Sequence, residues 1–255
     1  VPYIVNHAFA CHMLGMMSDL LELAVRYLLA CRPRASFVVA VAHGGEKSLH
    51  SSMSFTALVV VLIEPQGATA QRRLSMLQHV RKVFDPAYRR WPPHITLVPP
   101  AVYTPDGQDD ALDPPAWLVR HLQRLTAGVE RVCAEHPAHI LQLRHLAAFE
   151  RREAILHLRP SASSAEPLLS LQADVAQAAL PHMPGVRLRS TYVPHMTLGR
   201  VKTVERRREL EQRVMEVLGD GLEVRVDRVH IMYKRGEAKQ PYTTWRALPL
   251  GIRVP

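Results

Sequence analysis

From Phe55 onward, apolar residues follow two alternating periodicities. Short β-branched runs predict strands, and the segments between them repeat apolar residues every three to four positions, which predicts helices. We predict strands at 55–65, 91–100, 139–149, 153–159, 191–200, 222–234 and 245–251, and helices at 68–84, 116–134, 165–180 and 203–218. A loop rich in proline, aspartate and glycine is predicted at 104–115.

The order of strand, helix and strand occurs in both halves of this region. It predicts an α+β fold in which a duplicated unit forms two pseudo-symmetric lobes, with two antiparallel-rich sheets around a central groove. We place this domain at 55–251. Residues 1–54 are interpreted as an N-terminal extension of unknown role, with a helical pattern at 18–30 and a short apolar run at 36–45. A targeting or partner-binding segment is the less favoured alternative.

A five-residue motif occurs twice on predicted strands, as Pro-His-Ile-Thr-Leu at 93–97 and Pro-His-Met-Thr-Leu at 194–198. A chance repeat of this kind is expected on the order of once in ten thousand such chains. Side chains two positions apart on a strand share a face, about 6.6 Å from each other. His94 and Thr96 should therefore face one side, and His195 and Thr197 should do the same in the second copy.

Two histidines and two threonines on neighbouring strands suit phosphodiester chemistry. Histidine titrates near neutral pH, so one imidazole can act as base and the other as acid. The threonine hydroxyls can donate hydrogen bonds to the non-bridging phosphate oxygens. The motifs therefore predict a phosphodiesterase site that requires no metal.

This pair of motifs resembles the 2H phosphoesterase superfamily, which includes the 2'-5' RNA ligase-like and cyclic nucleotide phosphodiesterase proteins. The segments YVPHMTLGR and RALPLG are also similar to that family, and the resemblance covers 55–251. It implies a bilobal α+β fold, action on 2',3'-cyclic phosphates or on 2'-5' or 3' oligonucleotide ends, and no cofactor. It also implies that His94 and His195 form the acid–base pair and that Thr96 and Thr197 bind phosphate. Which histidine is the acid stays open.

Residues beside the motifs are further candidates for substrate binding. Arg200 follows the second motif, and Lys234 and Arg235 end a predicted strand, so their charges could hold phosphates, although a solvated surface charge is the favoured interpretation. Trp91 and Tyr192 each lie three residues before a motif histidine. They could stack on bases, and a packing role is an equal alternative.

Other polar residues are assigned no chemistry. His136 and His139 have metal-compatible spacing only in a helix, which the intervening Pro137 disfavours, so we assign no metal. The run ERRREL at 205–210 is interpreted as an exposed helical face, with RNA guidance as the alternative. The histidines interpreted as surface or core residues are His79, His121, His145, His157, His182 and His230.

Composition narrows the class of protein. The chain has 255 residues, of which 47% are hydrophobic, and no apolar run approaches the roughly 20 residues that cross a bilayer. A net charge of +9 favours polyanions such as phosphate-bearing substrates. Cys11, Cys31 and Cys133 are odd in number and far apart, which indicates a reducing compartment.

These observations predict a monomer that acts on RNA ends, oligonucleotides or cyclic nucleotides and does not bind membranes. We expect a cytoplasmic protein, and because the sequence begins with valine, a nuclear or organellar location stays open. The competing hypothesis is a nucleotide- or RNA-binding module without catalysis. The intact histidine and threonine pairs favour the enzyme, because a pure binder could lose either imidazole.

Overall fold

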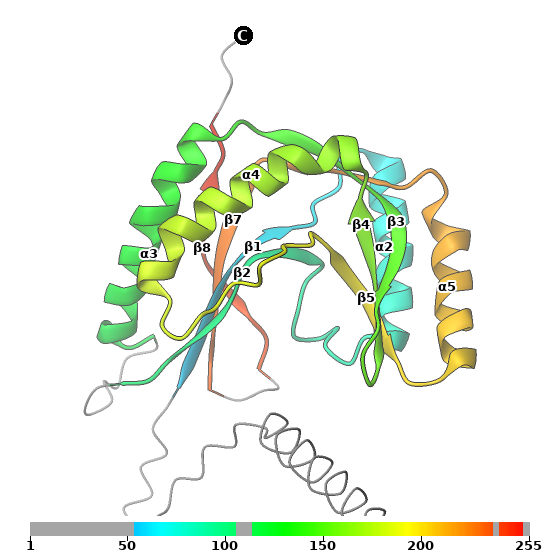
Figure 1. The fold of residues 1–255 in the computed structure, drawn as a ribbon, viewed down its shortest axis with the longest axis horizontal. Coiled ribbons are helices and arrows are strands. Elements are labelled where there is room, and N and C mark those ends of the chain that lie inside the picture. The colour runs from blue at the N-terminus through cyan, green and yellow to red at the C-terminus, as the bar shows by residue number, and fades with distance from the viewer. Residues whose placement is uncertain (1–53, 106–113, 237–239, 252–255) are drawn as a thin grey trace, which may run out of the picture. The chain divides into compact units, whose positions relative to one another are not determined.

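The computed structural model describes residues 54–105, 114–236 and 240–251 (Figure 1). The helix expected at 18–30, the apolar run at 36–45 and most of the loop at 104–115 lie outside these ranges. In chain order the elements are β1 (Phe55–Leu62), α2 (Ala68–Phe84), β2 (His94–Tyr103), α3 (Ala116–Glu135), β3 (His139–Phe149), β4 (Ala154–Pro160), α4 (Ala162–Ala179), the 3-10 turn η1 (Leu180–His182), β5 (Met196–Val201), α5 (Val204–Leu218), β6 (Leu222–Val226), β7 (Arg228–Arg235) and β8 (Thr243–Pro249).

The strands form one antiparallel sheet in the order β6-β3-β4-β5-β2-β1-β7-β8. The motif strands β2 and β5 are its two central members, joined through the single pair Ile95 and Met196. The two sheets expected from the sequence are thus two four-stranded halves of one sheet. The α+β class is confirmed, and the units β1-α2-β2 and β4-α4-β5 repeat across the centre.

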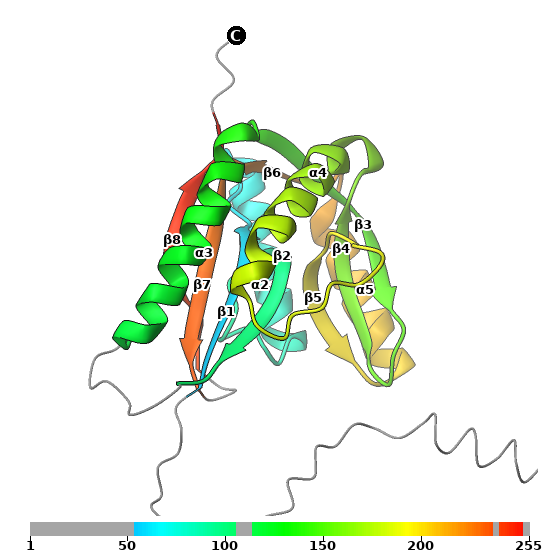
Figure 2. The ribbon, with the colours of Figure 1, turned by 60° about the vertical axis from the view of Figure 1, so that its left-hand side comes forward.

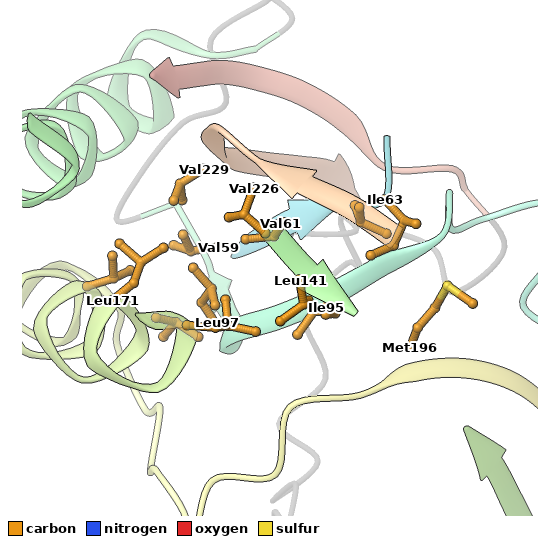
Figure 3. Close-up of a cluster of buried hydrophobic side chains, with 14 of the residues drawn as sticks. Val59, Val61, Ile63, Ile95, Leu97, Leu141, Leu171, Met196, Val226 and Val229 are labelled. Atoms are coloured by element: carbon orange, nitrogen blue, oxygen red, sulfur yellow. The ribbon is translucent and has the colours of Figure 1, made fainter. Parts of the chain in front are cut away.

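The helices pack in two pairs, of which α3 and α4 contact strands of both halves of the sheet, and α2 and α5 contact the half that contains β5 and β6. Helix α4 packs on α3 and on strands β2 and β3, whereas α2 packs on α5 and on strands β5 and β6 (Figures 1 and 2). The core between the helices and the sheet is continuous across both halves. One buried cluster contains Val59 and Ile95 from one half, Leu141 and Met196 from the other, and Leu171 of α4, and Figure 3 shows Leu141 beside Ile95.

Two strand predictions need correction. The strand expected at 222–234 is two strands, because the chain leaves β6, paired with β3, and enters β7, paired with β1 and β8. Asp227 lies at this break, where its side chain accepts a hydrogen bond from Arg228 and its carbonyl accepts one from the Leu250 amide. The strand expected at 191–200 begins only at Met196, so 191–195 is an irregular approach to β5.

Each motif strand has an irregular register just after its threonine. In β5, Thr197 pairs with His157 but Gly199 pairs with Leu156, which leaves one extra residue on β5. A Cβ at Gly199 would lie 2.7 Å from the Cβ of Phe84, so only glycine allows α2 to pack this closely. In β2 the carbonyl of Leu97 accepts a hydrogen bond from the buried Gln172 side chain of α4. These contacts hold both motif strands against the helices.

Candidate active site

The register of β2 and β5 brings the four motif side chains together. Because Ile95 pairs with Met196 in antiparallel orientation, His94 lies beside Thr197 and His195 lies beside Thr96. Such neighbours have Cβ atoms about 4.5–5.5 Å apart. Ile95 and Met196 are fully buried in the core, whereas the four polar side chains are only partly buried on the opposite face. The sequence-based expectation about their shared face agrees with this arrangement.

Both motif histidines have the same hydrogen bond. Nδ1 of His94 lies 2.7 Å from the carbonyl oxygen of Pro92, and Nδ1 of His195 lies 2.7 Å from that of Val193. A carbonyl oxygen only accepts, so Nδ1 carries the hydrogen in each ring. In the neutral ring the lone pair is therefore on Nε2. The fold fixes one tautomer in both histidines and leaves Nε2 for chemistry.

The surroundings of both imidazoles favour the neutral form. Burial lowers the pKa of His94 from 6.5 to about 4, although the hydrogen bond to Pro92 raises it, and the positive charges of Arg81 and His195 lower it further. Burial also lowers the pKa of His195, as do the charges of Arg189 and Arg159, against the raising effect of the bond to Val193. Each ring can thus accept a proton at neutral pH.

His94 should titrate with a midpoint of about 4 in the ligand-free protein. The ring stays neutral as the pH falls through 6.5 and gains its proton only near the lowered value. NMR titration of the ring carbons between about pH 3 and 8 measures this midpoint, with His94→Gln to assign the signal. A His94 midpoint above about 6 would contradict the structure.

An apolar and aromatic cluster covers the β1 side of the motifs. Trp91 stacks on His94 with ring centroids 4.6 Å apart, and Tyr242 stacks on Trp91 at 3.9 Å. Leu58, Val60 and Met232 form a small buried cluster against which Trp91 and Tyr242 pack. One face of Trp91 is therefore engaged with a motif histidine, which supports the packing role over base stacking for this residue.

The β4 side of the motifs is polar. His157 is almost fully buried, donates from Nδ1 to the carbonyl of Ile155, and lies edge-on to His195 with centroids 5.1 Å apart. Phe149 stacks on His157 and contacts His195 edge-on. Extending the pairs of β4 with β5 places Arg159 next to His195. None of these three residues was predicted to belong to the site, although the His-x-Arg spacing on a strand already puts His157 and Arg159 on one face.

The other predicted binding residues have different places. The hydroxyl of Tyr192 donates to the carbonyl of Thr96 at 3.0 Å, so Tyr192 ties the approach to β5 onto β2. Arg200 is exposed on β5 opposite Ile155, and the cations whose charges act on His195 are Arg159 and Arg189. Lys234 lies with Nζ 5.3 Å from the ring centre of Tyr242, beside the aromatic cluster.

The structure also bears on the run 205–210, on metal binding and on membrane spans. Arginines of α5 pair with glutamates, Arg206 with Glu209 and Arg207 with Glu211, which supports the exposed-face interpretation of 205–210. Within 54–105, 114–236 and 240–251, no group of three histidine, cysteine or acidic side chains could hold a metal ion. No helix in the same ranges is long and apolar enough to cross a membrane.

Comparisons with known proteins place this chain in a family. A family model described as the 2'-5' RNA ligase superfamily matches residues 65–238, a range that includes both motifs. Among solved structures, E. coli LigT complexed with 3'-AMP is 16% identical, over 77% of this chain and 98% of that chain, with a TM-score of 0.47. Kluyveromyces marxianus Usb1 with uridine monophosphate is 13% identical, over 78% and 99%, with a TM-score of 0.44. A search of curated proteins gave no match.

Proposed function

The chain belongs to the 2'-5' RNA ligase superfamily of 2H phosphoesterases, and from this membership we propose that it is a metal-independent phosphodiesterase acting on 2',3'-cyclic phosphates or on phosphodiesters at RNA and oligonucleotide ends. One observation carries the proposal. His94 and His195 lie across the central strand pair, and each holds its Nδ1 hydrogen on a carbonyl and leaves Nε2 for a substrate.

The four motif side chains can supply each part of the hydrolysis of a cyclic phosphate. One Nε2 takes a proton from water while the water oxygen bonds to phosphorus. The second imidazole, in its protonated form, gives its proton to the ribose oxygen as the bond from that oxygen to phosphorus breaks. Hydroxyls of Thr96 and Thr197 donate to the non-bridging oxygens and hold the phosphate in line.

The protonation states follow from the charge of the substrate. Without substrate, both imidazoles have lowered pKa values, so neither is a ready acid at neutral pH. A phosphate anion between them favours the protonated form of a ring and thus raises its pKa. Binding would therefore bring in the proton that the acid needs, while the other ring stays neutral and acts as base.

Hydrolysis of a panel of 2',3'-cyclic nucleotides and of RNA with a cyclic phosphate end tests the proposal. We expect turnover that is unchanged by EDTA, because all the acid, base and donor groups are side chains. The His94→Ala/His195→Ala variant should lose at least about 10²- to 10⁴-fold of the wild-type rate. Loss of wild-type turnover with EDTA, restored by a divalent ion, would contradict metal independence.

The competing function is a non-catalytic nucleotide- or RNA-binding module. It predicts that the wild type binds these ligands, with no turnover on any member of the panel. It also predicts that the double variant binds about as well as the wild type. Turnover by the wild type at a rate that depends on both histidines would exclude it.

A further inference from the structure

A pocket lies beside the second motif, at Pro194, and none of the four motif histidine and threonine side chains lines it. Its volume is about 430 Å³, within the range of about 300–1,000 Å³ that is usual for small-molecule sites. Its wall includes His145, Arg159, Ala165, Leu169, Tyr192 and Pro194. Figures 1 and 2 show the elements involved, with the segment before β5 running beside α4.

The residues beside the two motif histidines differ in charge, although the strands that carry the histidines are related by pseudo-symmetry. On the β4 side, the strand pairing puts Arg159 beside His195, and His145 pairs with Arg159. On the β1 side, the equivalent neighbour of His94 is Leu62, which packs against the aromatic cluster. The strand neighbour of the motif histidine is therefore a cation on the β4 side and an apolar residue on the β1 side.

Arg159 and Arg189 can bind an anionic ligand, because no carboxylate of the described residues forms an ion pair with them. Arg159 and Arg189 both act electrostatically on His195, and neither has an ion pair with a carboxylate among the residues that the structure describes. Arg207 and Arg213 of α5, in contrast, are paired with glutamates. Alongside Arg159, the apolar side chain of Leu169 offers surface to a base or sugar.

We propose that this pocket binds a second, phosphate-linked nucleotide unit of the substrate, with its phosphate on Arg159. The inference rests on the proposed function and narrows its substrate class to oligonucleotide ends rather than mononucleotides. Arg159 lies about one strand spacing, about 4.8 Å, beyond His195 in the sheet. A guanidinium there offers a planar pair of donors to the next phosphate along the chain, while the motifs hold the scissile one.

Binding of two product-like ligands tests the pocket without depending on turnover. One is a nucleoside 3'-phosphate, and the other is the dinucleotide 3'-phosphate with a 2'-deoxy upstream sugar that prevents cleavage, each with adenine and with uracil. In calorimetry, the wild type should bind the dinucleotide at least about tenfold more tightly, the effect of about one charge-assisted hydrogen bond. Arg159→Gln should remove most of this preference and change the affinity for the mononucleotide less than about threefold.

The matched control is Arg124→Gln, which removes the same charge from the exposed face of α3 and should keep the preference. Leu169→Asp places a carboxylate at the pocket wall. Like Arg159→Gln, it should remove the preference for the dinucleotide, because the carboxylate repels the phosphate. The proposal would be overturned if the wild type bound both ligands with equal affinity. It would also be overturned if Arg159→Gln and Arg124→Gln lost equal affinity for the dinucleotide. The proposed function would survive either outcome if any cyclic nucleotide or RNA with a cyclic phosphate end is hydrolysed, and it would fail separately if none of them is.

Discussion

His195→Ala and His94→Ala should each lower kcat/KM on a cyclic nucleotide by about 10²- to 10⁴-fold, the usual contribution of a positioned acid or base. The reason is the shared geometry of the two rings, each fixed by a 2.7 Å bond from Nδ1 to a carbonyl, so that Nε2 alone faces the substrate. The double variant should have a kcat/KM close to that of the more damaged single variant, because the acid and the base act as a unit and either one contributes little without the other.

The controls separate catalysis from folding. His79→Ala removes an exposed histidine on α2, which hydrogen-bonds only within its own helix, and should leave kcat/KM unchanged. Circular dichroism and thermal unfolding should show that the motif variants are folded, because the core positions Ile95 and Met196 are untouched. A His195→Ala variant with nearly wild-type kcat/KM would refute the assignment.

Most helices and strands of the described region could be predicted because their signals are local. Apolar periodicity gave α2 at 68–84 and β3 at 139–149 with the bounds that the structure has. The alternation within each motif also told which side chains enter the core. The sequence contained a signal at the break between β6 and β7 as well. Buried residues there change from Val224 and Val226 to Val229 and Ile231, so the alternation shifts by one residue at Asp227.

The rest of the site depends on strand register, which a single sequence does not encode locally. Arg159 and His157 belong to the site because β4 pairs with β5, and Leu62 and Val60 belong to it because β1 pairs with β2. The two motifs are alike in sequence, but the residues on their neighbouring strands are different. A centre with Arg159 beside His195, and with Leu62 and Trp91 beside His94, can bind an asymmetric substrate in one direction, which a pair of equivalent histidines alone could not impose.

A buried ion pair behind His94 was also beyond sequence analysis. Arg81 of α2 and Asp85 are 2% and 6% exposed, and Arg81 Nη2 lies 2.8 Å from Asp85 Oδ2. Arg81 also donates to the carbonyl of Trp91, the residue that stacks on His94. Asp85 accepts from the amide of Ala87, so the pair holds the whole turn between α2 and the first motif.

Asp85→Ala should lower the free energy of unfolding by about 3–5 kcal/mol, because it leaves the Arg81 guanidinium charged, buried and without its carboxylate. Urea denaturation at neutral pH measures the loss. The matched control is Asp220→Ala, which removes a carboxylate that is 98% exposed and 4.0 Å from Arg73, and should cost no more than about 1 kcal/mol.

A second variant shows whether the uncompensated charge causes that loss. Arg81→Met/Asp85→Ala removes both charges and retains an apolar side chain of similar length, so it should be more stable than Asp85→Ala alone. The double variant can also be compared with the two single variants, Asp85→Ala and Arg81→Met. If its loss of unfolding free energy equals the sum of the two single losses, the two side chains act independently and the pair is not the cause. In that case the bonds of Asp85 to Ala87 and of Arg81 to Trp91 would each support the turn separately, and the stacking of Trp91 on His94 would depend on the arginine alone.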